Sequence, residues 1–431
     1  MKILVVSASP WNNNNSFGIS YSNIFKGIDG LEFANVSFSR RLEQTDDEIV
    51  SRSFQVTTKM LINNLLKREK QLGIEGHIST ENHNKQNIEQ TSVMKFAKRK
   101  RWKILFWLND LIWSLGHWKS QELMDFIDDF QPDLIVQPIY FSSYLNDIAQ
   151  FIKNYTKVPM IGYISDDCYT LKQFSLSPLY WIDRLYKRRK VKETIEQCEL
   201  LYVISDVQKR EYEKIFTPPC KILTKCADFS DERKPAFKEP DEVLKMVYAG
   251  NVSRGRYEIL VELAKAIEKL NSNGKKFQLD IYTLTFLTDK QKNNIVTEDV
   301  RIHPPVSYEE IREIQSNSDI LLHVEAFSLK EKLAVHQSFS TKIVDYLETN
   351  RCIFAIGDDY CASIQYFLEN KCGAVATKKE NIETELSKLH SNRELLKQFA
   401  YNGWEIGGKN HKKKSIQAMI TGDLNYILNN K

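Results

Sequence analysis

The stretch HQSFSTKIVDYLETNRCIFAIGD, residues 336–358, joins a polar start, an amphipathic helical pattern and a compact apolar run. The polar start carries Ser338, Ser340, Thr341 and Lys342. The apolar run, CIFAIG, is typical of a parallel strand that is buried on both faces. A helix that leads directly into such a strand is part of the repeating unit of a doubly wound α/β sheet.

The same alternation of apolar runs and helical patterns continues on both sides of this stretch. Alternating strands and helices predict a parallel sheet with helices on both faces. At 431 residues the chain is too long for one ordinary core, and two domains of about 200 residues each are the natural division. Strands are expected at 2–7, 132–138, 158–165 and 200–205 in the first half, and at 245–250, 277–283, 300–306, 319–324 and 373–377 in the second.

A stretch rich in proline and charge, residues 217–243, separates the two halves and is typical of an interdomain linker. The first half is interrupted at about 45–130 by a long polar segment with a helical pattern. We therefore expect an α/β protein of two doubly wound Rossmann-like domains, with a ligand cleft between the carboxyl ends of their sheets. The expected parts are an N-terminal domain at 1–225 with a helical insertion at about 45–130, a linker at 226–243, a C-terminal domain at 244–408 and a final helix at 409–431.

Charge and cysteine content argue against several classes of protein. The net charge is only +4, with 60 basic against 56 acidic side chains, which argues against nucleic-acid binding through bulk charge. The seven cysteines include no Cys-x-x-Cys pair, which favours a reducing compartment. The first apolar run is too short for a secretory signal, and no segment is as long as a membrane span. We therefore expect a cytoplasmic protein.

The segment KFAKRKRWKILFWLNDLIWSLGHWKS, residues 95–120, combines a basic head with an aromatic body. Such a pattern suits a helix that lies in a membrane interface, so residues 95–118 are a candidate for peripheral contact with the inner face of the cell membrane. The simpler interpretation is a core helix with a solvated basic start, since Lys and Arg are normal on surface helices.

Two strand–helix junctions of the C-terminal half are candidates for binding a diphosphate. In YAGNVSRGRYEIL, residues 248–260, a strand ends at Gly250 and a loop with Arg254 and Arg256 leads into a helix. Guanidinium groups at a helix start bind phosphate well, although these two arginines also fit an ordinary loop.

The second junction is the quoted stretch itself. Its hydroxyls at Ser340 and Thr341, together with Lys342, suit a diphosphate at a helix start. Asp345, one turn further on, is placed to accept hydrogen bonds from two ribose hydroxyls. The simpler interpretation is a capped amphipathic helix without a ligand.

The third candidate junction is YISDDCYTLKQFSLSP, residues 163–178, at the end of a strand of the N-terminal half. Asp166 and Asp167 there are expected to face the cleft and to orient an acceptor hydroxyl, with Asp167 preferred. A metal site is not expected, because no His or further acid lies at ligand spacing nearby. The simpler interpretation is a turn that uses Asp for local hydrogen bonds.

The chain resembles the GT-B glycosyltransferases, and among them the large retaining family four, over almost its whole length. The resemblance is carried by YAGNVSRGRYE, SYEEIREIQSNSDILLHVE, FSTKIVDYLETNRCIFAIGDD and GAVAT, in this order. In that family the second of two spaced glutamates holds the donor ribose, and Asp345 stands at its position. The first glutamate lies near the transferred sugar, and Gln337 stands there instead, where it keeps a hydrogen bond to a sugar hydroxyl.

The resemblance implies roles for five further positions. Asn251 stands where the family often has an arginine, which leaves Arg254 and Arg256 for the diphosphate with Lys342 in support. Gly18 matches the glycine of the turn that approaches the donor phosphates.

The activity that the resemblance implies is transfer of a hexose-type sugar from a nucleotide diphosphate sugar to a glycan or lipid-linked acceptor. Retention of configuration, a role in bacterial surface polysaccharide biosynthesis, and chemistry without a metal or other cofactor are implied with it. Two alternatives remain: an inverting GT-B enzyme with Asp167 as general base, and a nucleotide-sugar-binding module without turnover.

Overall fold

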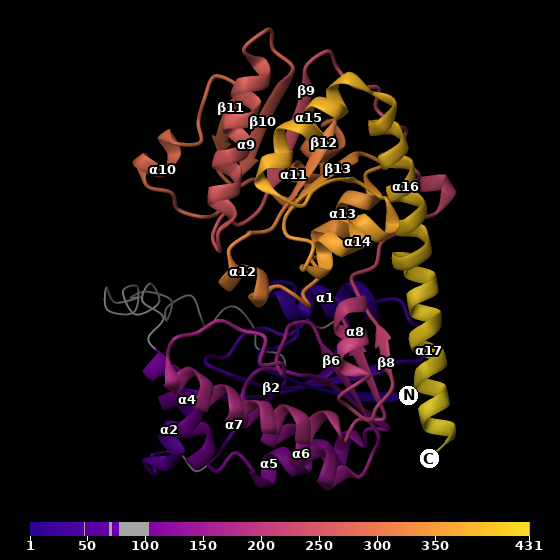
Figure 1. The fold of residues 1–431 in the computed structure, drawn as a ribbon. Coiled ribbons are helices and arrows are strands. Elements are labelled where there is room, and N and C mark those ends of the chain that lie inside the picture. The colour runs from indigo at the N-terminus through magenta and orange to yellow at the C-terminus, as the bar shows by residue number, and fades with distance from the viewer. Residues whose placement is uncertain (47, 69–70, 77–102, 431) are drawn as a thin grey trace.

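The computed structural model describes residues 1–46, 48–68, 71–76 and 103–430, which form two α/β domains stacked on one another (Figure 1). Within these residues, the N-terminal domain contains an eight-stranded sheet and the C-terminal domain a six-stranded sheet. The expected fold class, two doubly wound domains, is therefore confirmed.

The N-terminal sheet has the strand order β4-β3-β2-β1-β5-β6-β7-β8, and its pairs are parallel except for β3 with β4. Its strands are β1 (Lys2–Ser7), β2 (Glu32–Ser39), β3 (Val50–Thr57), β4 (Ile74–Glu75), β5 (Leu134–Pro138), β6 (Met160–Ile164), β7 (Leu200–Val203) and β8 (Cys220–Ile222). Its helices are α1 (Ser16–Phe25), α2 (Thr58–Leu65), α4 (Lys103–Leu115), α5 (Gln121–Phe130), α6 (Ser143–Thr156), α7 (Pro178–Ile195) and α8 (Asp206–Tyr212).

The C-terminal sheet is parallel, in the order β11-β10-β9-β12-β13-β14. Its strands are β9 (Leu244–Ala249), β10 (Phe277–Tyr282), β11 (Val300–His303), β12 (Ile320–Val324), β13 (Cys352–Ile356) and β14 (Ala374–Ala376). Its helices are α9 (Arg256–Asn271), α10 (Asp289–Asn293), α11 (Tyr308–Ser316), α12 (Leu329–Ala334), α13 (Lys342–Glu348), α14 (Ala362–Asn370), α15 (Ile382–Ser391) and α16 (Glu394–His411).

Each sheet has one point at which the strand order reverses. In the N-terminal sheet this point lies between β1 and β5, and in the C-terminal sheet between β9 and β12. Loops diverge there beyond the carboxyl ends of the strands, and open α/β sheets bind ligands in the crevice that results. The two reversal points therefore decide where a site is to be sought.

The expected helical insertion at about 45–130 is wrong in part, because residues 50–57, near its start, form strand β3. Strand β2 was not expected either. Neither strand has a continuous apolar run in the sequence, because both bury polar side chains. These side chains are satisfied by hydrogen bonds inside the domain. Asn35 donates to the carbonyl of Val5 (3.0 Å), and Gln55 donates to the carbonyl of Glu43 (2.7 Å).

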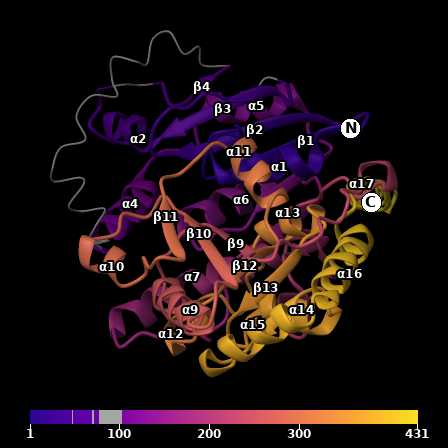
Figure 2. The same ribbon diagram turned by 90° about the horizontal axis from the view of Figure 1, so that it is seen from above.

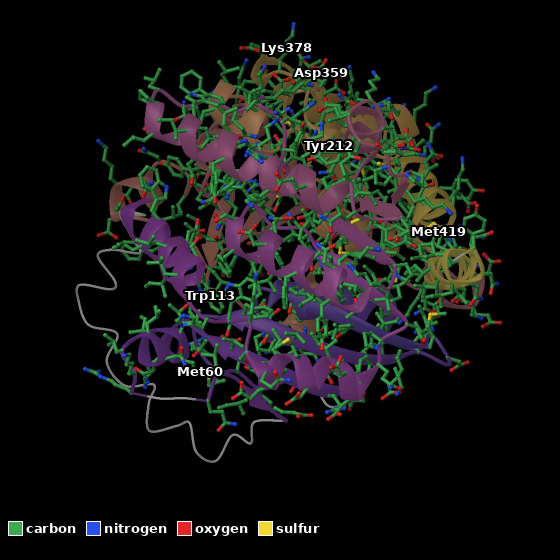
Figure 3. All side chains as sticks on the ribbon, turned by 90° about the horizontal axis from the view of Figure 1, so that it is seen from below. Met60, Trp113, Tyr212, Asp359, Lys378 and Met419 are labelled. Carbon is green, nitrogen blue, oxygen red and sulfur yellow. The ribbon has the colours of Figure 1, made fainter. Side chains whose placement is uncertain are left out.

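The segment proposed to contact a membrane is only partly described. Residues 95–102, with the basic head, lie outside the described residues, and α4 carries the aromatic body. Trp113 of α4, labelled in Figure 3, is fully buried and stacks on Tyr144 of α6 (4.7 Å between ring centroids). No helix within the described parts of the chain is long and apolar enough to cross a bilayer.

The chain crosses between the domains twice, and the two crossings meet. Ala227, on the way from β8 to β9, forms a β-bridge with Lys412, which separates α16 from α17 (Lys413–Asn429). Helix α17 then runs along the side of the N-terminal domain (Figure 1). Its buried residues Ile416, Ile420 and Leu424 join the hydrophobic core of the N-terminal sheet. The paired crossings therefore form one joint between the domains.

Candidate active site

Four charged or titratable side chains meet at the reversal point of the C-terminal sheet. Arg256 begins α9 after the loop from β9, His323 and Glu325 lie at the end of β12, and Lys342 begins α13. We call Arg256, His323, Glu325 and Lys342 the sheet-end cluster. They line a cavity of about 80 Å³ together with Asn251 and Ser340, among others.

Arg256 is held rigidly by the end of β12. Its Nε donates to the carbonyl of Val324 (2.9 Å), and a terminal nitrogen contacts Glu325 Oε2 (2.7 Å). The Glu325 side chain is buried, whereas that of Arg256 is about one-fifth exposed. A guanidinium fixed on one edge keeps its remaining donors for a ligand, which is how arginine binds phosphate.

Burial shifts the pKa values of Glu325, Lys342 and His323. It raises the pKa of Glu325, and the neighbouring Arg256 opposes this without cancelling it. It lowers the pKa of Lys342, with Arg256 adding to the shift. Burial, with the two cations nearby, lowers the pKa of His323 to about 3. His323 is therefore neutral at physiological pH. The charged members of the cluster are the cations Arg256 and Lys342 and the carboxylate of Glu325.

Gly250 creates the space that Lys342 occupies. The Lys342 ammonium donates to the carbonyl of Ala249 (2.8 Å), and a β-carbon at Gly250 would lie only 2.6 Å from it. The predicted roles of Gly250 and Lys342 are thus linked. Because Gly250 has no side chain, the Lys342 ammonium has room to lie beside it.

The other predicted loop residues shape the junction. Asn251 lines the small cavity, and its Oδ1 accepts hydrogen bonds from the amide of Ser253 (2.7 Å) and the hydroxyl of Thr285 (3.2 Å). Arg254 is exposed, adopts a left-handed backbone (φ 58°) and lines neither this cavity nor the larger one described next. The structure therefore places Arg256, and not Arg254, in the cluster.

A larger cavity of about 620 Å³ lies between the domains. Its C-terminal side is formed by residues 338–341, and Ser340 also lines the small cavity, so the two are neighbours. The N-terminal side presents aromatic and polar groups from α1, from the end of β6 and from the loops after β5 and β6. These include Phe17, Tyr21, Tyr140, Tyr163 and Asp166.

The expected hydroxyl capping of α13 is absent. The residue before the helix, Thr341, has a helical backbone, and its side chain makes no capping hydrogen bond. Within the described residues, the hydroxyls of Ser340 and Thr341 have no hydrogen bond that would occupy them, and both residues line the cleft cavity. The simpler interpretation of these hydroxyls, capping alone, is therefore wrong.

The adjacent carboxylates Asp166 and Asp167 differ in their surroundings. Asp167 is 5% exposed and pairs with Arg184 (3.2 Å). Its oxygens also accept from the amides of Tyr169 and Thr170, the hydroxyl of Thr170 and the amide of Gln173. Its acceptor capacity is used within the loop. This reverses the expected order of the pair, because the preferred Asp167 acts as a structural anchor.

Asp166 is exposed at the cleft cavity. One of its oxygens accepts a hydrogen bond from the Ser338 hydroxyl of the other domain (3.1 Å). The structure thus brings Asp166 and the 338–341 segment together across the cleft. Asp166 is the carboxylate that remains available to an acceptor.

A second network joins the domains beside the cleft, and Gln337 belongs to it. Glu211 of α8 accepts from Lys172 (2.5 Å), from His336 Nε2 (2.8 Å) and from the Gln337 amide (2.7 Å). We call Lys172, Glu211, His336 and Gln337 the domain seam. Gln337 is 1% exposed, and its side-chain amide is committed to the seam through Glu211.

Asp345 is also occupied elsewhere. Its carboxylate pairs with Lys225 at 2.5 Å and lies 4.0 Å from Arg312, beside the joint between the domains. It lines neither the small cavity nor the cleft cavity. A ribose at Asp345 would have to displace Lys225.

Gly18 lies in the first turn of α1, and its α-carbon faces the preceding loop rather than the cleft. A β-carbon there would lie 1.8 Å from the carbonyl oxygen of Asn12. Gly18 therefore permits the tight turn between β1 and α1, while its neighbours Ser16 and Phe17 line the cavity.

Glu325, His323 and Glu211 were missed from the sequence. Glu325 had a detectable signal, since an acid that directly follows a buried parallel strand lies at the carboxyl edge of the sheet. His323 and Glu211 had none, because one lies inside a strand and the other on a helix far away in the chain.

The side chains give little support for a catalytic cysteine or for a metal site. Cys168 lines the cleft cavity, but burial raises the pKa of its thiol far above the ordinary value, so it remains a weak nucleophile. All seven cysteines are buried and free. Among the described residues, no group of three His, Cys, Asp or Glu side chains is placed to hold a metal ion.

Comparison with known proteins identifies the fold. No protein-family model and no curated protein matches the sequence. Sucrose-phosphate synthase from Thermosynechococcus elongatus superposes with a TM-score of 0.64 at 9% identity, and the match covers 100% of both chains. HepE from Anabaena, solved with UDP and glucose, superposes with a TM-score of 0.60 at 10% identity and covers 99% of this chain and 100% of its own.

The chain has the GT-B glycosyltransferase fold. WaaG, a glycosyltransferase of lipopolysaccharide biosynthesis, has it too, with a TM-score of 0.57 at 11% identity over 97% of this chain and 100% of its own. At these identities the GT-B likeness concerns the backbone. The roles of individual side chains rest on the geometry described above.

Proposed function

We propose that this GT-B chain is a glycosyltransferase that moves a hexose-type sugar from a nucleotide diphosphate sugar to a glycan or lipid-linked acceptor. One observation carries the proposal. Arg256 and Lys342 converge at the reversal point of the C-terminal sheet, next to a cavity whose other wall belongs to the N-terminal domain. That arrangement suits a donor bound by one domain and an acceptor bound by the other.

The chemistry needs stabilisation of the departing diphosphate. Arg256 and Lys342 supply fixed positive charge in a partly buried place, where it acts more strongly than in water. The free hydroxyls of Ser340 and Thr341 add donors next to it. These groups do the work of leaving-group stabilisation without a metal ion, and no other cofactor enters the proposal.

We favour retention of configuration over the inverting alternative. With retention, the departing phosphate oxygen takes the proton of the acceptor hydroxyl, and a protein base is not needed. An inverting mechanism with Asp167 as base is disfavoured, because the oxygens of Asp167 already accept hydrogen bonds from its own loop and pair with Arg184. Asp166 orients the acceptor in our proposal.

The cavity walls favour a carbohydrate acceptor. Aromatic faces together with hydroxyl and carboxylate groups, such as Tyr140, Tyr163 and Asp166, suit a sugar ring with its polar edge and apolar face. WaaG acts in lipopolysaccharide biosynthesis, and we place this chain in bacterial surface polysaccharide biosynthesis at the cytoplasmic side of the membrane.

A thermal-shift screen with nucleoside diphosphates tests the donor site. UDP is the first ligand to try, since HepE was solved with it, and GDP and ADP follow. At about 100 times Kd, a ligand of the folded state stabilises it by about 2.7 kcal/mol, which raises the melting temperature by several degrees. If no nucleoside diphosphate raises it, the donor assignment is wrong.

Substitutions of Asp166 and Asp167 distinguish a role in acceptor binding from a structural role. Asp166→Asn is expected to lower transfer about a hundredfold while the melting temperature and the nucleotide shift stay unchanged. Asp167→Asn is expected to destabilise the fold by about 3 kcal/mol, because it leaves Arg184 unpaired inside the loop. Equal effects of both changes on transfer, with intact stability, would contradict the assignment.

A binding module without turnover is the second candidate. It is favoured by Gln337, which replaces the acid of the resembled family and points into the domain seam. Incubation with a panel of nucleotide sugars decides between the two. Release of nucleotide together with a new glycoside supports transfer, and binding without any release supports the module.

A further inference from the structure

Tyr21 of α1 carries a buried hydroxyl that makes no hydrogen bond with the rest of the described chain. The residue lines the cleft cavity and is only 2% exposed, and its Oη has no partner among the described residues. A buried hydroxyl without a partner costs stability, and native structures contain few such groups. Its position at the wall of a cavity points to a ligand as the missing partner.

The ring of Tyr21 is held in place by aromatic neighbours that do not need its hydroxyl. Its centroid lies 4.4 Å from that of Phe17, 5.4 Å from that of Trp11 and 5.5 Å from that of Phe25. Trp11 is fully buried and is itself fixed, since its Nε1 donates to the hydroxyl of Ser22 (2.9 Å). A phenyl ring at position 21 would make the same ring contacts, so the hydroxyl serves something other than packing.

The hydroxyl of Tyr21 lies on the side of α1 that faces the cleft. Helix α1 lies at the boundary between the domains in Figure 1 and beneath α11 and α13 in the view of Figure 2. The ring of Tyr163, which also lines the cavity, crosses that of Tyr21 at 70° with 5.9 Å between centroids. Burial raises the pKa of Tyr21 well above its ordinary value, and the nearby phenols of Tyr140 and Tyr163 add to the shift. The Tyr21 hydroxyl therefore stays neutral, able both to donate and to accept a hydrogen bond.

The N-terminal wall of the cleft carries net negative charge. Among the described residues that line the cavity on this side, the acids are Asp166 and Asp167 and the one cation is Arg184. Arg184 pairs with Asp167 (3.2 Å) and donates to the carbonyl of Thr170 (2.6 Å), so Asp166 has no cationic partner within the described parts of the chain. Two carboxylates against one guanidinium leave a charge of −1, and the proposed function assigns the two cations of the sheet-end cluster to the donor diphosphate. A sugar that itself carries a carboxylate would therefore be repelled at this wall.

We propose that Tyr21 and Asp166 form an acceptor subsite for an uncharged pyranose ring, and that the Tyr21 hydroxyl orients the ring by a hydrogen bond to one of its hydroxyls. The rings of Phe17 and Tyr163 suit the apolar face of the pyranose. That the sugar serves as an acceptor rests on the proposed function. Its binding and its lack of charge are measurable without turnover.

Saturation-transfer difference NMR on the full-length chain tests the charge of the ligand. The probes are the methyl pyranosides of glucose, galactose, mannose and N-acetylglucosamine, together with methyl glucuronide, each with and without UDP. At least one neutral pyranoside is expected to bind, and methyl glucuronide is expected to bind about tenfold more weakly than it. Asp166→Asn should bring the two affinities to within about threefold, because the repelling charge is removed. Absence of binding by every neutral pyranoside, or equal binding of the glucuronide to the natural chain, would overturn the proposal.

Tyr21→Phe tests the hydroxyl itself and is expected to move stability and binding in opposite directions. Neutral pyranoside binding should weaken about fivefold, while the melting temperature should rise by about 2 °C because a buried hydroxyl without a partner is removed. The matched control is Tyr212→Phe in α8, labelled in Figure 3, which removes a phenol hydroxyl from the core of the same domain. Tyr212 lines neither cavity, so its loss is expected to leave pyranoside binding unchanged. Unchanged binding in Tyr21→Phe, or an equal loss in both variants, would contradict the role of Tyr21.

The remaining outcomes separate this subsite from the proposed function. Pyranoside binding that depends on Tyr21, without any nucleotide-induced thermal shift or turnover, leaves the sugar subsite standing and removes the donor assignment. Transfer to a neutral sugar that Tyr21→Phe leaves unchanged in KM and kcat keeps the proposed function and overturns the subsite. If the subsite is correct and transfer occurs, Tyr21→Phe should raise the KM of the acceptor about fivefold and leave nucleoside diphosphate affinity unchanged.

Discussion

The sheet-end cluster and the domain seam each contain a carboxylate paired with cationic groups, but they differ in which parts of the molecule they connect. Glu325 accepts from Arg256 in the cluster, and Glu211 accepts from Lys172, His336 and Gln337 in the seam. All members of the cluster belong to the C-terminal domain. The seam takes Lys172 and Glu211 from one domain and His336 and Gln337 from the other.

The cluster and the seam differ in their dependence on domain closure. The cluster is assembled by the ends of β9 and β12 and keeps its geometry however the domains are arranged. The seam exists only while α8 touches the segment before α13. Donor affinity is therefore expected to follow the cluster, and the productive meeting of donor and acceptor is expected to follow the seam as well.

Removal of the two cations of the cluster has the largest expected effect. Arg256→Ala combined with Lys342→Ala is expected to lower transfer about a thousandfold or more, because the leaving diphosphate loses both fixed charges. Nucleoside diphosphate binding should weaken with it, as measured by titration calorimetry. The seam is untouched, so small-angle scattering should report an unchanged radius of gyration.

Arg254→Ala is the matched control. It removes an arginine from the same loop that lines neither cavity, and it is expected to change transfer less than about threefold. If Arg254→Ala costs as much as Arg256→Ala, the loop rearranges on binding and the cluster as described is incomplete.

Much of the cluster could be predicted from the sequence, and the seam could not. Arg256 and Lys342 each begin a helix that follows a buried strand, so topology alone brings them to one edge of the sheet. Glu211 lies 125 residues from His336 in the chain, and no local pattern relates them. The seam depends on how two domains pack, which the sequence pattern does not contain.

The adjacent acids Asp166 and Asp167 show that the partners of a side chain are hard to predict even within one domain. The sequence placed Asp166 and Asp167 at the cleft with Asp167 preferred, and the structure reverses this order because the ranking depends on Arg184, which comes from α7. Likewise Asp345 was expected at the ribose, but Lys225 from the other side of the joint occupies it. The position of each acid along its strand or helix was predictable from the sequence, whereas the residues that pair with it were not.

Breaking the seam has a smaller expected effect than breaking the cluster. Glu211→Ala leaves His336, Gln337 and Lys172 without their shared acceptor, and we expect a loss of about 2 kcal/mol in interdomain stability. Transfer should fall about tenfold while nucleoside diphosphate affinity stays unchanged, since the cluster is intact. Small-angle scattering should show a larger radius of gyration.

Arg210→Ala controls for a general effect of changing α8, since Arg210 makes an exposed contact with Gln365 (3.2 Å) and a loose pairing with Glu369 (3.7 Å). It is expected to leave the radius of gyration and transfer unchanged. A fall in nucleotide affinity with Glu211→Ala would show that seam and cluster are coupled, so that the cluster is not independent of domain closure.

The pH dependence of the seam is the smallest expected effect. Burial opposes the charge of Glu211, but hydrogen bonds from Lys172, His336 and Gln337 outweigh it and lower the pKa of Glu211 below its ordinary value of 4.5. A carboxyl whose pKa is lowered in the folded state stabilises that state above the unfolded pKa and loses this contribution as pH falls through the folded pKa. The natural chain should therefore exceed Glu211→Gln in unfolding free energy by about 1 kcal/mol at pH about 6, and the difference should shrink towards zero below pH about 4. Urea unfolding at several pH values measures it, and a difference that grows on acidification would mean that Glu211 does not hold the seam as a carboxylate.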